Sequence, residues 1–389
     1  MRNLRMQLSR IMVAFAVLAT WPSHAFAQSF ETSAAQAFMV DVETGTVLFS
    51  KEPDAAFAPA SLAKLMTMEV VFHAIGEGKL SLDDTFAVSE NAWRTGGAPS
   101  GTSTMFAALK SSVAVRDLVR GVVVQQANDG CIVLAEGLAG SESAFAEMMN
   151  ERARALGLTG SHFVNATGLP AEGQKTTVRD LVTLSTHLRQ AHPDLFAIYA
   201  EPSFEWNKIY QLNRNPLLKL DLGADGLATG WSKEGGFAIA GSASRDGRRL
   251  LLAMSGLASD SQRADEARRM LEWGNKAFQR QEIFRDGELV GLAQTYGGAK
   301  GGVALKARGP ISILVPVDNR ERLIARIVYE GPLEAPVEAG VQVGKLKVWV
   351  GESLRQETPL YTAEQVPVGG LHRRALDAIE ELLIGWTRG

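Results

Sequence analysis

A serine and a lysine three residues apart, Ser61 and Lys64, are the residues of this chain whose types and spacing could perform covalent catalysis. If the segment APASLAKLMTMEVVF is helical from Ser61, a spacing of three places the hydroxyl and the amine on the same helix face. A serine is a poor nucleophile at neutral pH and needs a nearby base. A lysine desolvated among leucine and methionine side chains can have its pKa lowered enough to serve. The pattern therefore predicts acyl transfer through a serine ester.

The position of Ser61 in a first helical turn adds to this prediction. Backbone N–H groups at a helix N-terminus lie where negative charge develops on an attacked carbonyl. A serine and a lysine at this spacing are nevertheless common, and an N-cap serine beside a surface lysine fits the same two residues. The remainder of the chain has to decide between the two interpretations.

The sequence contains no motif for the other common kinds of catalytic, nucleotide-binding or metal-binding site. It contains no G-x-S-x-G elbow, H-E-x-x-H, C-x-x-C or Walker A loop. We expect no metal site, because the histidines outside the N-terminal segment have no metal-ligand spacing, and His187 and His192, across a helix end, are expected to be solvated. A Ser-His-Asp triad is not excluded by spacing, but nothing points to one.

The elements that must position Ser61 and Lys64 follow from the periodicity of apolar residues. AAQAFMVDVETGTVLFSKE predicts an opening hairpin, and helical spacing begins near Ser61 and continues to Ala74. Strands are expected at 203–211 and, about an Asp-Gly turn, at 236–257, and RADEARRMLEWGNKAF predicts a long amphipathic helix. Further helices are predicted at 113–126, 130–139, 142–156 and 177–191.

The pattern changes after Gln281, where short runs at β spacing are broken by Gly, Pro and Asn. We predict a small all-β domain over residues 284–368, preceded by a larger domain over residues 28–280. Residues 369–389 predict an amphipathic helix, which either packs on its own domain or lies on a membrane surface with Trp386 at the interface.

Composition and the N-terminus limit the class of protein. The chain has 389 residues, 46% of them hydrophobic, enough for two domains with their own cores. Residues 1–27 predict a signal peptide cleaved after Ala27, and its loss changes the formal net charge from −3 to −6. That mild negative charge argues against nucleic acid as a partner. The single cysteine, Cys131, forms no internal disulfide and is expected to be a buried small hydrophobe.

Several sequence blocks, in order, resemble a known family. They are APASLAKLMT after the opening hairpin, then VVVQQANDGCIVLAEGLAGSESAFAEMMNERARALGLTGSHFVNATGLP, then QLNRNPLL and GADGLATG. Together they resemble the low-molecular-weight penicillin-binding proteins, specifically the serine-type D-alanyl-D-alanine carboxypeptidases of the peptidase S11 type. The resemblance covers about residues 30–280 and extends to the β domain and the C-terminal helix. It implies an α/β (α+β) catalytic domain like that of the serine β-lactamases.

The resemblance implies a role for each matching residue through the three motifs S-x-x-K, S-x-N and K-T-G. Ser61 would be the acylated nucleophile and Lys64 its general base, and Asn128 matches the asparagine of the second motif. Thr229 and Gly230 match the third motif, and the backbone N–H groups of Trp231 and Ser61 would form the oxyanion hole. The implied reaction is attack on the D-Ala-D-Ala peptide bond of peptidoglycan stem peptides, with no metal or cofactor, and β-lactams would be covalent inhibitors.

Two positions depart from the family's motifs: Gln126 stands where the family has serine, and Ala228 stands where it has lysine. The missing hydroxyl removes a proton relay, and general acid–base assistance is worth about 10²–10⁴-fold. The missing amine removes a charged hydrogen bond worth roughly 1.5–3 kcal/mol. Arg214 could contact the substrate carboxylate in place of that lysine, and Lys233 is a second candidate.

These departures leave more than one function open. The favoured interpretation is an active carboxypeptidase of the periplasm, attached to the outer face of the inner membrane if its C-terminal helix binds lipid. The alternative is a degenerate homologue that binds peptidoglycan or a partner with little turnover. A third possibility is another amide or ester substrate, as in β-lactamases, for which the sequence shows no obvious deacylating glutamate.

Overall fold

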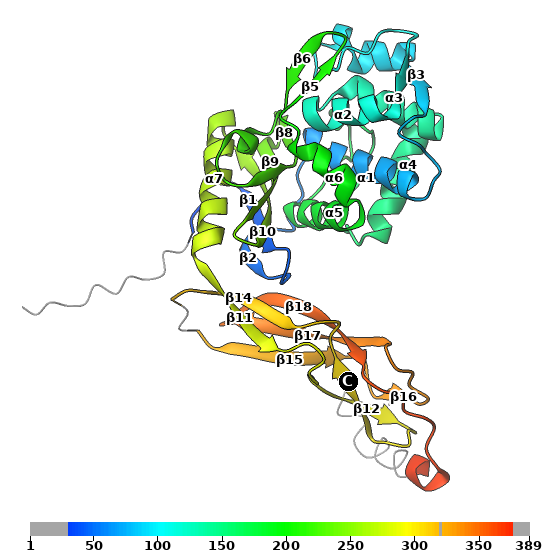
Figure 1. Cartoon of the computed structure of the whole chain (residues 1–389), viewed down its shortest axis with the longest axis vertical. Helices are drawn as coiled ribbons and strands as arrows, with labels where there is room; N and C mark the ends of the chain where they lie inside the picture. The colour runs from blue at the N-terminus through cyan, green and yellow to red at the C-terminus, as the bar shows by residue number, and fades with distance from the viewer. Residues whose placement is uncertain (1–29, 319–320, 376–389) are drawn as a thin grey trace, which may run out of the picture.

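The structure is a computed structural model that describes residues 30–318 and 321–375. Its N-terminal domain combines one antiparallel sheet with a group of helices, and an elongated β domain follows (Figure 1). The helices are α1 (Lys64–Gly76), α2 (Val115–Gln125), α3 (Asn128–Ala139), α4 (Glu142–Ala155), α5 (Val178–Ala191), α6 (Pro193–Phe196) and α7 (Asp260–Lys276).

The N-terminal sheet has the order β2-β1-β10-β9-β7, and β8 pairs with β9 beside β7. Its first two strands are the predicted opening hairpin, and its two long central strands are the predicted Asp-Gly hairpin. The strands are β1 (Gln36–Asp41), β2 (Val47–Lys51), β7 (Ala224–Gly226), β8 (Thr229–Ser232), β9 (Gly236–Arg245) and β10 (Arg248–Leu257).

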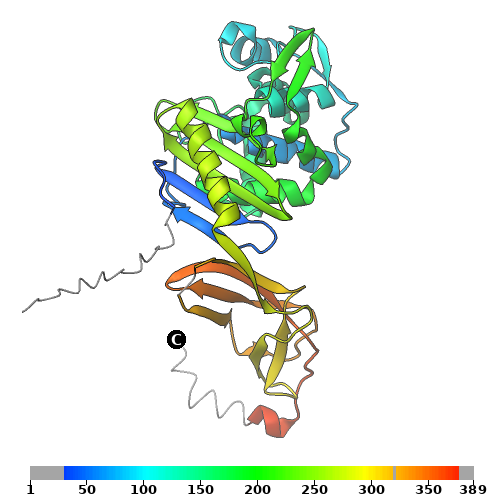
Figure 2. The same cartoon turned by 60° about the vertical axis from the view of Figure 1, so that its left-hand side comes forward.

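This sheet is covered on both faces, which explains why β9 and β10 read as almost continuous apolar runs. On β10, Leu251 and Ala253 join the core formed with the helices α1 to α5, while Leu250 and Leu252 join a second core with α7. Figure 2 shows α7 lying across the outer face of the sheet, with the other helices behind it. The alternation follows the two-residue period of a strand.

Helix α1 runs through the middle of the helical group, and every residue from Lys64 to Phe72 is buried. A helix that is buried all round has no solvent face for its polar residues. Its lysine, threonine and glutamate must therefore find partners inside the protein. Thr67 does so by donating from Oγ1 to the Ala166 carbonyl at 2.6 Å.

The other predicted helices of this domain are confirmed within a few residues of their expected ends. Thr177 caps α5 by accepting from the Asp180 N–H at 3.1 Å, a role that threonine commonly has at this position. Cys131 is fully buried on α3, and burial raises its pKa to about 12, so it is an inert core residue. Two small hairpins complete the domain: β3 (Thr85–Ala87) with β4 (Ser112–Ala114), and β5 (Ser203–Trp206) with β6 (Ile209–Leu212).

The C-terminal region is all β, as predicted, and has its own apolar core. Its first strand, β11, follows α7 directly and pairs with β14, and the other strands form a sheet of order β15-β17-β18-β13-β12-β16. The strands are β11 (Phe278–Phe284), β12 (Gly291–Tyr296), β13 (Gly302–Lys306), β14 (Ile311–Pro316), β15 (Leu323–Tyr329), β16 (Leu333–Glu334), β17 (Gln342–Val350) and β18 (Ser353–Thr362).

The predicted C-terminal helix can be followed only at its beginning. Residues 371–375 are helical, and residues 376–389 lie outside the described part of the chain. The predicted signal peptide also lies outside it. Within the described residues, no helix is long and apolar enough to cross a membrane.

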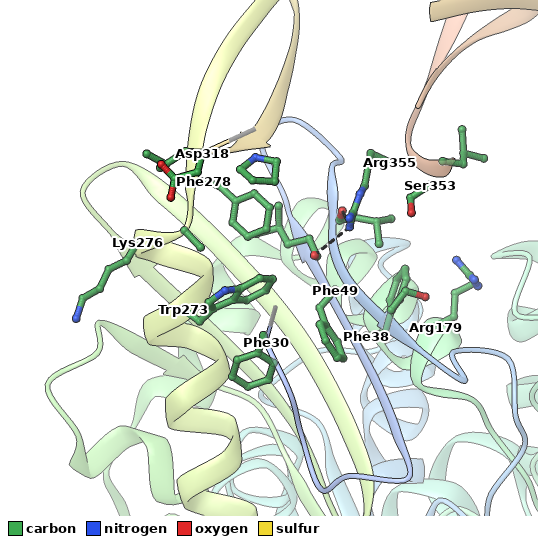
Figure 3. A pocket seen from close by; sticks show the side chains of 17 residues that line it. Phe30, Phe38, Phe49, Arg179, Trp273, Lys276, Phe278, Asp318, Ser353 and Arg355 are labelled. Atoms are coloured by element: carbon green, nitrogen blue, oxygen red, sulfur yellow. Dashed lines mark hydrogen bonds between the residues drawn. The ribbon is translucent and has the colours of Figure 1, made fainter. Parts of the chain in front are cut away.

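A hollow of about 970 Å³ lies where the two domains meet (Figure 3). Aromatic side chains from separate parts of the chain line it, among them Phe30, Phe49, Trp273 and Phe278. Arg355 of the β domain donates to the Val47 carbonyl at 3.2 Å and the Leu48 carbonyl at 3.1 Å across this junction. The residues that line this hollow do not include Ser61 or Lys64.

Candidate active site

Ser61 lies in a short 3-10 turn, η1 (Ala60–Ala63), that leads directly into α1. The Lys64 Nζ lies 3.1 Å from the Ser61 Oγ, which is the proximity that their spacing predicts. The lysine is only 3% exposed, whereas the serine is partly open to solvent. Ala60, just before the serine, has a φ of +47°, a strained value for a residue with a Cβ. A partly accessible serine therefore lies beside a buried amine.

The pKa of Lys64 is lowered to about 8, mainly by burial and in smaller part by the nearby positive charge of Arg214. A lysine with that pKa is partly neutral at physiological pH, as a general base must be. Its Nζ also donates to the Thr167 carbonyl at 2.5 Å, which fixes the direction of the amine.

The loop that supplies this carbonyl is itself held rigidly. Asn165 Oδ1 accepts from the N–H groups of Thr167 at 3.2 Å and Gly168 at 2.8 Å. Gly168 has a φ of +78°, and a Cβ there would lie 1.8 Å from the Ala60 carbonyl oxygen. Only glycine therefore allows this loop to approach the turn that carries Ser61.

Asn128 is the first residue of α3 and is 4% exposed. Its Nδ2 donates to Thr102 Oγ1 at 2.9 Å, and its Oδ1 has no hydrogen-bond partner among the described residues. The neighbouring Asp129 is fully buried and accepts from the N–H groups of Met105 and Ala107, each at 3.0 Å. This carboxylate ties the segment after Thr102 to the start of α3, and an acceptor of Asn128 remains unused.

Gln126 and Ala228 lie close together although they are about a hundred residues apart in sequence. Both line the same cavity of about 10 Å³, together with Lys64 and Tyr199. Gln126 is 5% exposed and ends α2 with a left-handed φ of +56°, and Ala228 is 4% exposed. The two positions at which the sequence leads us to expect departures from the family's motifs therefore lie together, next to Lys64.

The stretch Thr229–Ser232 forms β8 and packs against η1. A Cβ on Gly230 would lie 2.9 Å from the Pro59 carbonyl oxygen, so this position also requires close backbone approach. Thr229 is 4% exposed, and the Trp231 side chain is 59% exposed. A cleft of about 390 Å³ opens beside this strand, and its lining includes Pro59, Ala60, Gly168, Glu172, Trp231 and Ser232.

The two cations considered as substitutes for the missing lysine lie in different places. Arg214 donates from Nε to the Gln125 carbonyl at 3.1 Å, next to Gln126, and its charge reaches Lys64. Lys233 is exposed in the turn that joins β8 to β9. Because its charge acts on Lys64, Arg214 is a better candidate than Lys233 to replace the lysine expected at position 228.

Sequence reasoning missed a third cation, Arg263 of α7. It is only 7% exposed and donates from Nη1 to the Gly230 carbonyl at 3.3 Å, behind the third motif. It also pairs with Asp260. Its helix carries many charges, and nothing in the sequence distinguishes this buried arginine from those that face solvent. Thr167 and Asn165 were missed as well, although they belong to the block NATGLP that carries the family resemblance.

Comparison with known proteins identifies the family to which this chain belongs. The model of the D-alanyl-D-alanine carboxypeptidase family, Peptidase S11, matches residues 23–257, more than half of the chain. The chain belongs to this family. A second model, for the C-terminal domain of penicillin-binding protein 5, matches residues 278–368. The family, the α/β catalytic domain and the all-β domain expected from the sequence are confirmed.

The carboxypeptidase family includes relatives that match nearly the whole chain. The D-alanyl-D-alanine carboxypeptidase DacD of Salmonella typhimurium is 36% identical over 87% of this chain and 88% of its own. DacC of Escherichia coli is 35% identical over 88% of this chain and 86% of its own. The crystal structure of penicillin-binding protein 5 from Haemophilus influenzae superposes with a TM-score of 0.75, at 30% identity, over 87% of this chain and 98% of that one.

A further solved structure bears on inhibitors. Penicillin-binding protein D2 from Listeria monocytogenes, in its ampicillin-bound form, matches 64% of this chain and 99% of its own, with a TM-score of 0.55 and 29% identity. That relative therefore binds a β-lactam.

Proposed function

We propose that this serine-type D-Ala-D-Ala carboxypeptidase removes the terminal D-alanine of peptidoglycan stem peptides through an acyl-enzyme on Ser61. The observation that carries the proposal is the 3.1 Å separation between Lys64 Nζ and Ser61 Oγ, with the lysine desolvated and its pKa lowered to about 8. The amine takes the proton of the attacking hydroxyl, the serine oxygen bonds to the penultimate D-alanine carbonyl, and terminal D-alanine leaves with a proton. Water then hydrolyses the ester and restores Ser61.

The remaining site residues bind and orient the substrate in this proposal. Asn128 offers its free Oδ1 to the peptide, and Thr229 and Gly230 form the strand along which the substrate lies. The N–H groups of Ser61 and Trp231 receive the developing oxyanion. Arg214, with Arg263 behind β8, supplies positive charge for the terminal carboxylate in place of the absent lysine.

Gln126 and Ala228 are a coupled replacement in this account. A lysine at position 228 needs four more heavy atoms than alanine, but the shared cavity of about 10 Å³ is at or below the space that one water molecule requires. Little space is left next to Lys64, and Gln126 is among the residues that line it. We infer that this glutamine and alanine fit together where the resemblance leads us to expect a serine and a lysine.

The test is release of D-alanine from a stem pentapeptide by the purified full chain, with Ser61→Ala as the matched control. The proposal expects release by the wild type and none by the variant. The degenerate-homologue alternative expects no release by either protein but binding of the pentapeptide by both. Hydrolysis of a penicillin faster than that of the pentapeptide would instead favour the β-lactamase-like alternative.

We further propose that residues 1–27 direct export to the periplasm and that residues 369–389 attach the protein to the outer face of the inner membrane. The apolar positions Leu371, Ala375, Ala378, Leu382 and Trp386 share one helical face in the sequence. Deleting residues 371–389 is expected to move the protein from the membrane fraction to the soluble fraction. An unchanged distribution would contradict attachment by this segment.

A further inference from the structure

A second group of titratable side chains lies on α1, away from the proposed active site. Glu69 follows Lys64 by five residues, which turns it about 140° round the helix from the lysine. It is fully buried, and two histidines approach its carboxylate from the end of α5: His187 and His192. The expectation that these histidines are solvated is wrong, because the side chain of His192 is only 9% exposed and that of His187 is 29% exposed.

The three side chains converge at distances that suit a small cation. Glu69 Oε1 lies 3.1 Å from His187 Nε2, and Glu69 Oε2 lies 3.6 Å from His192 Nε2. One potential ligand atom from each of the three residues lies within 4.8 Å of the others. In tetrahedral zinc sites with bonds of about 2.0–2.1 Å, ligand atoms are about 3.3 Å apart. Small side-chain shifts would complete the geometry.

Two of these atoms have no hydrogen-bond partner among the described residues. Glu69 Oε2 and His192 Nε2 are both buried, and they face each other at 3.6 Å. Buried polar atoms are nearly always satisfied, so an unpaired acceptor opposite an unpaired ring nitrogen needs an explanation. A cation between them would satisfy both atoms at once.

The charge state of the histidines is compatible with metal binding. Burial lowers the pKa of His187, and it lowers the pKa of His192 to about 4, so both imidazoles are neutral at physiological pH. Neutral imidazole is the form that binds a metal. Two imidazoles and one carboxylate are a donor set typical of zinc and its neighbours in the first transition row.

One group opposes a metal at this place. Arg152 of α4 donates from Nε to Glu69 Oε1 at 2.8 Å, and its Nη2 lies 3.0 Å from His187 Nε2. Its side chain is 21% exposed, so it has a route to solvent. In the absence of a metal, this guanidinium partly neutralises the carboxylate. A metal would have to displace it.

We propose that Glu69, His187 and His192 form a binding site for a divalent transition metal of the zinc class, with Arg152 as the competing cation. The site joins α1, which begins at Lys64, to the end of α5. It is separate from the hydrolytic reaction and takes no part in it. Its role is to fix the position of α1 when metal is bound.

The test is metal titration of the purified, chelator-treated full chain, using Zn²⁺ in calorimetry and Co²⁺ for its visible absorption. We expect one Zn²⁺ per chain, a Co²⁺ spectrum of four-coordinate type, and a rise in the unfolding temperature on adding Zn²⁺. His187→Ala and His192→Ala should each weaken binding by at least about 100-fold. The matched control is His162→Ala, an exposed histidine outside the cluster, which should bind as the wild type does.

The Arg152→Gln variant tests the metal site independently of whether the alanine variants fold. Removing the guanidinium should tighten Zn²⁺ binding by about 10-fold or more, because a positive charge leaves the immediate surroundings of the ion. Failure of both the wild type and Arg152→Gln to bind one equivalent would overturn the proposal. Equal binding by the His187→Ala, His192→Ala and His162→Ala variants would do the same, since the metal would then lie elsewhere.

Discussion

The rate at which a penicillin acylates the protein should depend on pH through Lys64. A general base must be neutral, and burial lowers the pKa of this amine from its ordinary value of 10.5 to about 8. At pH 7 the neutral fraction is then about 9%, against about 0.03% for an unperturbed lysine, a gain of about 300-fold. The acylation rate should rise about 90-fold between pH 6 and pH 9, steeply below pH 8 and little above it.

The assay is the second-order rate constant for labelling by a fluorescent penicillin, measured at constant ionic strength across this range. The Arg214→Gln variant provides a directional control. The positive charge of Arg214 lowers the pKa of Lys64, so its removal should raise that pKa and move the profile toward higher pH. A flat profile from pH 6 to pH 9, or a midpoint above pH 10, would refute the assignment of Lys64 as a desolvated base. A shift of the Arg214→Gln profile toward lower pH would refute the electrostatic part.

Three further predictions concern this base and its surroundings. Lys64→Met should be more stable than the wild type by about 3 kcal/mol below pH 8, because the lowered pKa makes protonation of Lys64 in the folded wild type costly. This advantage should disappear as the pH rises to 10.5, and a stability difference that stays constant with pH in denaturant unfolding would contradict it. Gly168→Ala should slow acylation by about 10²-fold or more, since its Cβ would lie 1.8 Å from the Ala60 carbonyl oxygen and displace Ser61. The control is Gly173→Ala, which should be acylated at nearly the normal rate, because Gly173 also has a positive φ but its Cβ would come no closer than 3.9 Å to another side chain. Ala228→Lys should destabilise the protein when made alone and should destabilise it less when combined with Gln126→Ser. If the two substitutions change the stability measured by thermal unfolding additively, they do not share a cavity.

Most of the fold could be predicted from the sequence because its elements carry strong local signals. The opening hairpin, the buried helix after Ser61 and the helix capped by Thr177 each follow from periodicity or end residues. The beginning of the β domain was harder to predict, since Phe278–Phe284 follows α7 without a break and becomes a strand only through pairing with β14. Pairing over more than thirty residues leaves no local signal.

The candidate site was predictable where chemistry depends on spacing along one element, and not where it depends on packing. Ser61 and Lys64 lie on consecutive turns, so their proximity follows from helical geometry. Arg263 and the Thr167 carbonyl reach the site from distant parts of the chain, and the sequence gives no measure of that approach. The sequence likewise does not show that Glu69 meets His187 and His192. Glu69 is over a hundred residues from both histidines, and they come together only because α1 and α5 pack against each other.

The central claim, that Ser61 remains a working nucleophile beside Gln126 and Ala228, is tested most directly by intact-protein and peptide mass spectrometry after incubation with a penicillin. We expect a mass increase of one drug molecule per chain, located on the peptide that contains Ser61 and absent from Ser61→Ala. No adduct after prolonged incubation of the folded wild type near pH 8, or an adduct on a different residue, would contradict it.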